Sequence, residues 1–293
     1  MTTPIPPIIP RQLSKQQKPF DENEPEHWLN NTQVVTEFIH SLSGLFPEGE
    51  AFFVRSVRAF CDDDRISKNE KLMKEVKAFV SQEAQHSAEH ASYNKKIGKM
   101  YQHDMDRIDS LIRTIFTFAE KSSLFLGNNK YVCLGITCSL EHLTAVLAEV
   151  LLTTDEGNYV ISAMSPSHRA LWVWHAIEET EHKSVAYDVY CAVGAWYIAR
   201  VWRHFITLLI FIGVVSYINI QFMFDRANYF DFVGVWRLFQ FLFLYPGILR
   251  KFTPLWLEYL QPGTYCALCC QENRRVGEYR HTCYNRRSYV IDC

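Results

Sequence analysis

Two Glu-x-x-His pairs are the residues of this chain whose types and spacing could do chemistry. The first pair is Glu83 and His86, and the second is Glu179 and His182. A spacing of three residues puts a carboxylate and an imidazole on one face of a helix, where both can reach the same ion. One such pair in a helix is common on a solvated face. Because the chain has two, the pattern predicts a metal site.

Two further glutamates complete a dinuclear ligand set. A di-metal site in a helical bundle takes one more glutamate from each of the other two helices. Glu50 lies in the first turn of the helix predicted over EGEAFFVRSVRAF, and Glu141 lies in the middle of YVCLGITCSLEHLTAVLAEVLL. Glu48 and Glu149 are their respective alternatives. Burying so many carboxylates without cations would cost far too much, so either these residues are exposed or metals neutralise them.

The predicted cofactors are two metal ions. Mixed carboxylate and imidazole ligands suit iron or manganese and also accept zinc, and iron is the favoured assignment. Glu83 and Glu179 are the expected bridging and catalytic carboxylates. His175 lies one turn before Glu179 and shares its face, whereas His90, one turn after His86, is expected to be a hydrogen-bonded buried histidine or a partner of a ligand. Three neighbouring glutamates are interpreted as solvated or ion-paired: Glu89, Glu178 and Glu181.

The elements that must position these residues are helices. Between about residues 32 and 203 the apolar residues recur at helical intervals, glycine and proline lie at the joints, and no strand-like alternation is found. The pattern predicts an all-α fold, and four long helices with short joints favour a four-helix bundle. The expected helices run from about 48 to 61, from 67 (with Ser67 and Glu70 as a capping box) to 97, from 104 to 126, from 130 to 154 and from 167 to 190.

Two apolar segments follow the predicted bundle. Residues 205–224 contain no charged side chain, and residues 232–249 are interrupted only by Arg237. The first segment is long enough to cross a bilayer, and the cations at residues 200, 203, 250 and 251 favour a hairpin with both ends in the cytosol. A buried helical pair that caps the bundle is the alternative. The C-terminal apolar helical hairpin is therefore interpreted either as a membrane anchor or as part of the core.

Composition excludes several classes of protein. The formal net charge is −2 and no long basic run is interleaved with aromatic residues, so nucleic acid is not an expected partner. The first 30 residues have no secretory apolar stretch, and the nine cysteines are irregularly spaced, which favours buried thiols in the cytosol. Five cysteines crowd into the tail. A zinc site there would lack a second pair of cysteine or histidine ligands, so an unstructured end is preferred.

The predicted organisation follows from these observations. It is a disordered or extended arm over residues 1–30, a di-metal bundle over 31–203, the apolar hairpin over 204–262 and a Cys-rich tail over 263–293. The catalytic bundle is expected in the cytoplasm, and a membrane hairpin would anchor it to the inner membrane.

Four segments resemble a known family. PEGEAFFVRSVRAF, EAQHSAEH, the helix around Glu141 and WHAIEETEHKSVAYDVY look like the bacterial predicted metal-dependent hydrolases, over about residues 30 to 260. That family is similar to ferritin-like di-iron proteins, so the resemblance implies a ferritin-like four-helix bundle. The His-x-x-x-Glu-x-x-His pattern also resembles the p-aminobenzoate N-oxygenase type of di-iron enzyme, which implies that His175 is a ligand.

Three functions remain open at this point. The first is oxidation of an apolar small molecule or lipid by O₂ at two irons. The second is two-metal hydrolysis of an ester, amide or phosphoryl bond. The third is a non-catalytic metal-binding membrane bundle. Membrane association and a homodimer are compatible with all three.

Overall fold

The structure, a computed structural model, describes residues 8, 11, 13, 25–29, 32–121, 129–182, 184–225 and 231–260, without the side chains of His182 and Glu258. Within these ranges the chain is helical apart from turns and one isolated bridge between Leu29 and Met164. The all-α prediction is confirmed. The chain divides into unit 1, which contains Met1–Val35, His142–Ser184 and Phe232–Cys293, and unit 2, which contains Thr36–Glu141 and Val185–Asp231.

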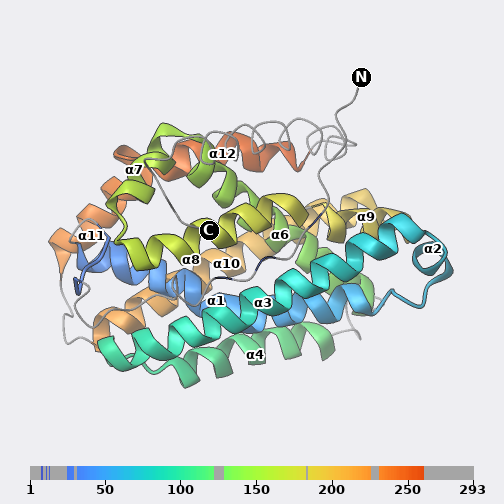
Figure 1. The fold of residues 1–293 in the computed structure, drawn as a ribbon, viewed down its shortest axis with the longest axis horizontal. Coiled ribbons are helices and arrows are strands. Elements are labelled where there is room, and N and C mark those ends of the chain that lie inside the picture. Colours follow the sequence, from blue (N-terminus) through green and yellow to red (C-terminus); the bar gives the residue numbers. More distant parts are fainter. Residues whose placement is uncertain are drawn as a thin grey trace. The chain divides into compact units, whose positions relative to one another are not determined.

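Unit 2 is built on long helices that lie side by side. Its elements are α1 (Gln33–Arg58), α2 (Asp64–Ser67), α3 (Glu70–Tyr101), α4 (Met105–Lys121), the first half of α6 (Asn129–Thr153), α9 (Val185–Ala192) and α10 (Tyr197–Asp225). Figure 1 shows α3 and α4 running alongside α1, and the rings of Phe52 and Phe116 stack between α1 and α4 with centroids 4.3 Å apart. α3 also packs against α2 and α9.

Helix α1 continues through Pro47. A proline inside a helix removes the N–H that would bond the carbonyl four residues earlier, here that of Ser43. Asn94 of α3 replaces the missing donor, because its Nδ2 donates to Ser43 O at 2.9 Å while its Oδ1 accepts from Ser43 Oγ at 2.6 Å. Ser87 of α3 donates to Pro47 O at 2.8 Å. These contacts hold the turn that carries Glu50.

Several expected helix boundaries were wrong. α1 begins at Gln33 rather than near residue 48, because Asn94 compensates for Pro47. α3 is capped by Asn69, whose side chain accepts from Leu72 N, so the Ser67 capping box was wrong. The helix expected from 167 to 190 is two helices, α8 (Pro166–His182) and α9. α4 ends at Lys121, and residues 122–126 of its expected range lie outside the described residues.

Unit 1 packs the second half of α6 against α8. Ala148 and Leu152 of α6 contact Val173 and Ala176 of α8 in one buried apolar cluster. The other helices are α7 (Asp155–Ala163), which follows α6 after the N-cap Thr154, then α11 (Phe232–Phe239), the π-helix η2 (Gln240–Leu244) and α12 (Ile248–Glu258). The expected second apolar segment is thus broken, since Pro246 and Gly247, with φ of 77°, separate η2 from α12.

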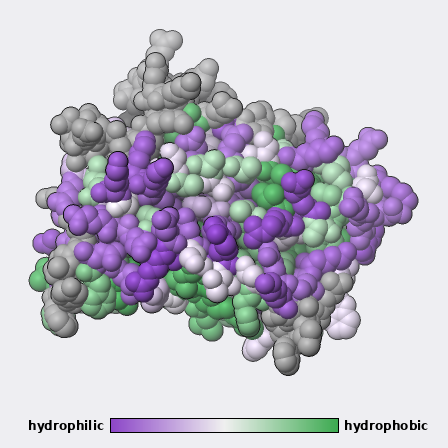
Figure 2. Space-filling model, turned by 90° about the horizontal axis from the view of Figure 1, so that it is seen from below, coloured by the Kyte–Doolittle hydropathy of each residue, from purple (hydrophilic) through white to green (hydrophobic). Residues whose placement is uncertain are grey.

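Two described helices are long and apolar enough to cross a membrane. The apolar window of α6 is 72% buried, whereas that of α10 is only 28% buried. The bent pair Phe232–Leu244 and Ile248–Leu257 would be a third span if it counted as one. One side of α10 is buried at Val215, Ile218 and Phe222, and its other side exposes Trp202, Leu209, Ile210 and Ile212. Figure 2 shows one face on which apolar residues form patches among hydrophilic ones.

Candidate metal centre

The predicted ligands of unit 2 lie on α1, α3 and α6 and are buried. Glu50 on α1 is 1% exposed, and Glu83 and His86 on α3 are fully buried. Because Glu83 and His86 are three residues apart, both point from the same face of α3, with His86 Nδ1 3.8 Å from Glu83 Oε1. Glu141 on α6 is also fully buried, and its alternative Glu149 is 4% exposed.

The predicted ligands of unit 1 lie on α8. His175 Nε2 is 3.1 Å from Glu179 Oε1, as expected for residues one helical turn apart. The other oxygen of Glu179 accepts a 2.6 Å hydrogen bond from Thr144 Oγ1 of α6. This bond fixes the rotamer of the carboxylate and leaves Oε1 toward His175. His182 is the last residue of α8, and its side chain lies outside the described residues.

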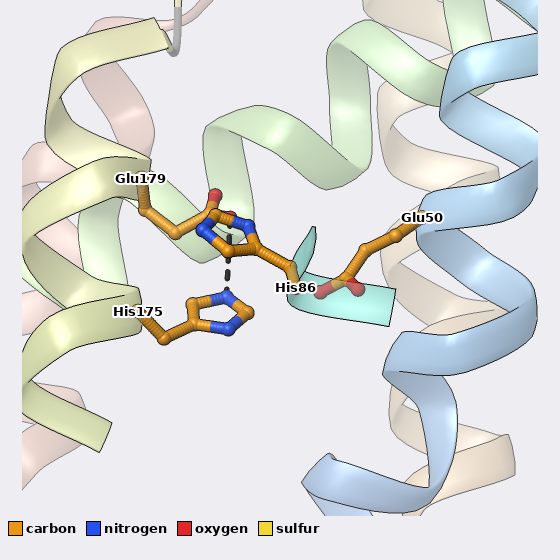
Figure 3. Close-up of side chains that lie close together, drawn as sticks. All are labelled: Glu50, His86, His175 and Glu179. Carbon is orange, nitrogen blue, oxygen red and sulfur yellow. Dashed lines mark ion pairs between the residues drawn. The ribbon is translucent and has the colours of Figure 1, made fainter. Parts of the chain in front are cut away.

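Four of the predicted ligands are buried glutamate and histidine side chains that could bind metal ions. They are Glu50 and His86 in unit 2 and His175 and Glu179 in unit 1. Figure 3 shows the four side chains, carried by α1, α3 and α8, with the ion pair of His175 and Glu179 dashed. Two carboxylates and two imidazoles suit iron, manganese or zinc, so the donor set fits the predicted metals.

Residues around the ligands supply neutral groups. Cys138 precedes Glu141 by one turn of α6, and burial, with the nearby Cys191 and Glu141 adding to it, raises the pKa of this thiol well above its usual value. Burial likewise raises the pKa of Tyr187 on α9 to about 12. Both side chains therefore stay protonated at neutral pH when no ion is bound.

The neighbouring acids and histidine have partners of their own. His90 is buried, and its Nδ1 shares a 2.9 Å hydrogen bond with Ser43 Oγ, as expected for a hydrogen-bonded buried histidine. Arg11 pairs with both glutamates beside the α8 ligands: its backbone N–H donates to Glu178 Oε1 at 2.7 Å, and its guanidinium binds both oxygens of Glu181 at 2.8 and 2.9 Å. The interpretation of Glu178 and Glu181 as ion-paired is confirmed.

Sequence reasoning missed two parts of this arrangement. The hydrogen bond from Thr144 to Glu179 joins residues 35 positions apart and has no local signal. A second buried group, formed by Glu37, His40 and His103, was also missed, although Glu37 and His40 have the same Glu-x-x-His spacing as the recognised pairs. The expected start of the first helix near residue 48 placed this motif outside any helix.

Comparison with known proteins assigns the family. Residues 12–264 match the family model described as predicted metal-dependent hydrolase. The chain belongs to this family. No curated protein and no solved structure matches the chain.

Proposed function

We propose that this protein is a dinuclear metal enzyme that oxidises an apolar small molecule or lipid with O₂. Two irons would be held by the full predicted set, which is Glu50, Glu83, His86, Glu141, His175, Glu179 and His182. The observation that carries the proposal is the burial of metal-type carboxylates and imidazoles in each unit, Glu83 with His86 in unit 2 and His175 with Glu179 in unit 1. Helical bundles that bind two irons present glutamates and Glu-x-x-His pairs from four helices in this way.

Two ferrous ions would supply the electrons that activate O₂, and the residues of the chain would control where this happens. Glu83 and Glu179 are the proposed bridging carboxylates. Thr144 orients the Glu179 carboxylate by its hydrogen bond to Oε2, with Oε1 beside His175. Trp172, 8% exposed and one turn before His175, adds a buried apolar side chain to the same face of α8.

Hydrolysis is the second candidate because the family is described as predicted metal-dependent hydrolases. Two divalent ions can lower the pKa of a bound water and polarise a carbonyl or phosphoryl oxygen. The same ligand set accepts zinc or manganese. The same ligand types serve oxidation and hydrolysis. The two reactions are therefore distinguished by which metal is bound and by how it responds to O₂.

The deciding experiment measures bound metal and oxygen chemistry in one preparation. The purified protein is freed of metal, loaded anaerobically with ferrous iron and exposed to O₂ while oxygen uptake and the optical spectrum are followed. Two irons per chain with rapid uptake support oxidation, and His86→Ala should abolish both. Retained zinc or manganese, no oxygen uptake and cleavage of generic esters would replace oxidation by hydrolysis. Metal binding with neither reaction would leave a non-catalytic bundle.

We also propose that α10 attaches the protein to a membrane, which would bring it to an apolar substrate. Leu209 and Ile212 are 70% and 52% exposed on the same side of this helix. The test is membrane partition that resists high salt and yields to detergent. Leu209→Asp with Ile212→Asp should release the protein, whereas Phe118→Asp on α4, where the side chain is 73% exposed, should not. Equal release by both variants would refute the assignment.

A further inference from the structure

A second group of metal-type ligands is buried within unit 2, apart from the ligand set described above. Glu37 and His40 lie one turn apart on α1, and His103 lies in the short segment between α3 and α4. Their exposed fractions are 1%, 0% and 5%. One ligand atom from each residue lies within 4.8 Å of the other two, so the three side chains converge on one point.

The distances within the group suit a small divalent ion. Glu37 Oε2 is 3.6 Å from His40 Nδ1 and 2.7 Å from His103 Nε2. Ligand atoms of a tetrahedral zinc lie about 3.3 Å apart, because Zn–N and Zn–O bonds are about 2.0–2.1 Å long. The observed separations lie on either side of that value. If an ion replaced the shared proton, Glu37 and His103 would separate by about 0.6 Å and Glu37 and His40 would approach by about 0.3 Å to reach this spacing.

His103 is held in an orientation that exposes one ring nitrogen to the group. Its ring stacks on Phe222 of α10 with centroids 3.9 Å apart and an interplanar angle of 18°. Its second nitrogen, Nδ1, is 3.4 Å from Asp225 Oδ2 at the end of α10. A carboxylate near the far nitrogen of a histidine is a usual support of a metal-binding imidazole, because it stabilises a proton on that nitrogen when the other nitrogen binds an ion.

The backbone around His103 is also specialised. Gln102, which ends α3, has a φ of 61°, a left-handed conformation that is uncommon for a residue other than glycine. A Cβ at Gly98 would lie 2.7 Å from Met105 Cγ and 3.1 Å from His103 O, so only glycine lets this segment close onto α3. The chain therefore turns back sharply at Gln102, and this turn places His103 next to Glu37 and His40.

The charges of the group favour a cation. Glu37 is buried beside two imidazoles, and Asp225, whose side chain is 28% exposed, adds a second carboxylate 3.4 Å from His103 Nδ1. A divalent ion would take the place of the imidazole protons and offset the cost of burying the Glu37 carboxylate.

We infer that Glu37, His40 and His103 form a third metal site, which binds one zinc-type divalent ion with Asp225 supporting His103. The ligands come from α1 and from the segment between α3 and α4, so a bound ion would join these two parts of the chain. A site made by three protein ligands and a water matches the coordination that zinc accepts.

The test uses cobalt(II) as an optical probe of zinc sites. The background is the double variant His86→Ala, His175→Ala, which lacks two ligands of the dinuclear set and keeps the proposed third site. Freed of metal and titrated with cobalt, this protein should bind one ion per chain with the intense visible bands of tetrahedral nitrogen and oxygen coordination. Adding His103→Gln should abolish these bands. The matched control His168→Gln, a fully buried histidine stacked on Trp28 in unit 1, should retain them.

Two results would overturn the inference. One is no cobalt bound in the double-variant background, and the other is the same bands after His103→Gln. Glu37→Gln provides a second test if His103→Gln does not fold, because it keeps the side-chain volume. This substitution should lower cobalt affinity at least about tenfold. Failure of the dinuclear proposal is distinguishable, because the wild-type protein would then bind one ion that survives His86→Ala and is lost with His103→Gln.

Discussion

Replacing Thr144 by valine tests whether Glu179 is a metal ligand. The substitution keeps the shape of the side chain and removes the hydroxyl that donates to Glu179 Oε2 at 2.6 Å. A hydrogen bond to a charged group contributes about 1.5–3 kcal/mol. Since about 1.4 kcal/mol corresponds to a factor of ten in affinity, the dinuclear centre should lose roughly 10- to 100-fold in metal affinity.

The assay is competition between the protein and a chromophoric chelator for ferrous iron or zinc. Thr144→Ser keeps the hydroxyl and should bind metal as tightly as the wild-type protein. Thr137→Val is the matched control on the same helix, because Thr137 Oγ1 makes an equally short 2.6 Å hydrogen bond with Ser56 Oγ. Unchanged affinity in Thr144→Val, or an equal loss in Thr137→Val, would refute the role given to Glu179.

Two stability predictions follow from unit 2. Asn94→Ala removes two hydrogen bonds of Ser43 and should lower the free energy of unfolding by about 2–4 kcal/mol. In a Pro47→Ala background residue 47 regains its N–H, so the same substitution should cost about 1 kcal/mol less. Urea unfolding measures both losses, and additive losses would contradict the role given to Asn94 in α1. Burial, then the charges of Glu48 and Asp106, raises the pKa of Asp109 to about 6. Because this carboxyl binds a proton more readily when folded, it destabilises the protein increasingly as pH rises from about 4 to 6. Asp109→Asn should therefore stabilise by about 1–2 kcal/mol at pH 8, allowing for solvent screening, and by almost nothing at pH 4; an equal gain at both values would exclude the titration.

The helical class and the face shared by each ligand pair could be predicted from the sequence, because both depend on residues three or four apart. Glu83 with His86, and His175 with Glu179, lie as the helical period requires. Their assignment as metal ligands stays a prediction, as does that of Glu50 and Glu141.

Features that depend on tertiary contacts could not be predicted in the same way. Pro47 is a local signal to end a helix, and only Asn94 on another helix cancels it. Because the first helix was expected to start near residue 48, the Glu-x-x-His spacing of Glu37 and His40 was not interpreted as a ligand pair. Arg11 lies in a segment rich in proline and charge, yet it is the partner of two glutamates of α8. In each case the deciding partner is at least 50 positions away in the chain.

The hydrogen bonds by which α3 compensates for Pro47 in α1 have a consequence for the order of folding. The turn before Glu50 has its full set of hydrogen bonds only after Asn94 and Ser87 have docked against it. An isolated α1 would fray or bend at Pro47, since the Ser43 carbonyl would then have only water as a partner. Glu50 thus reaches its position only in chains whose first two long helices have already paired. Chains that lack this pairing would not position Glu50 within the proposed ligand set.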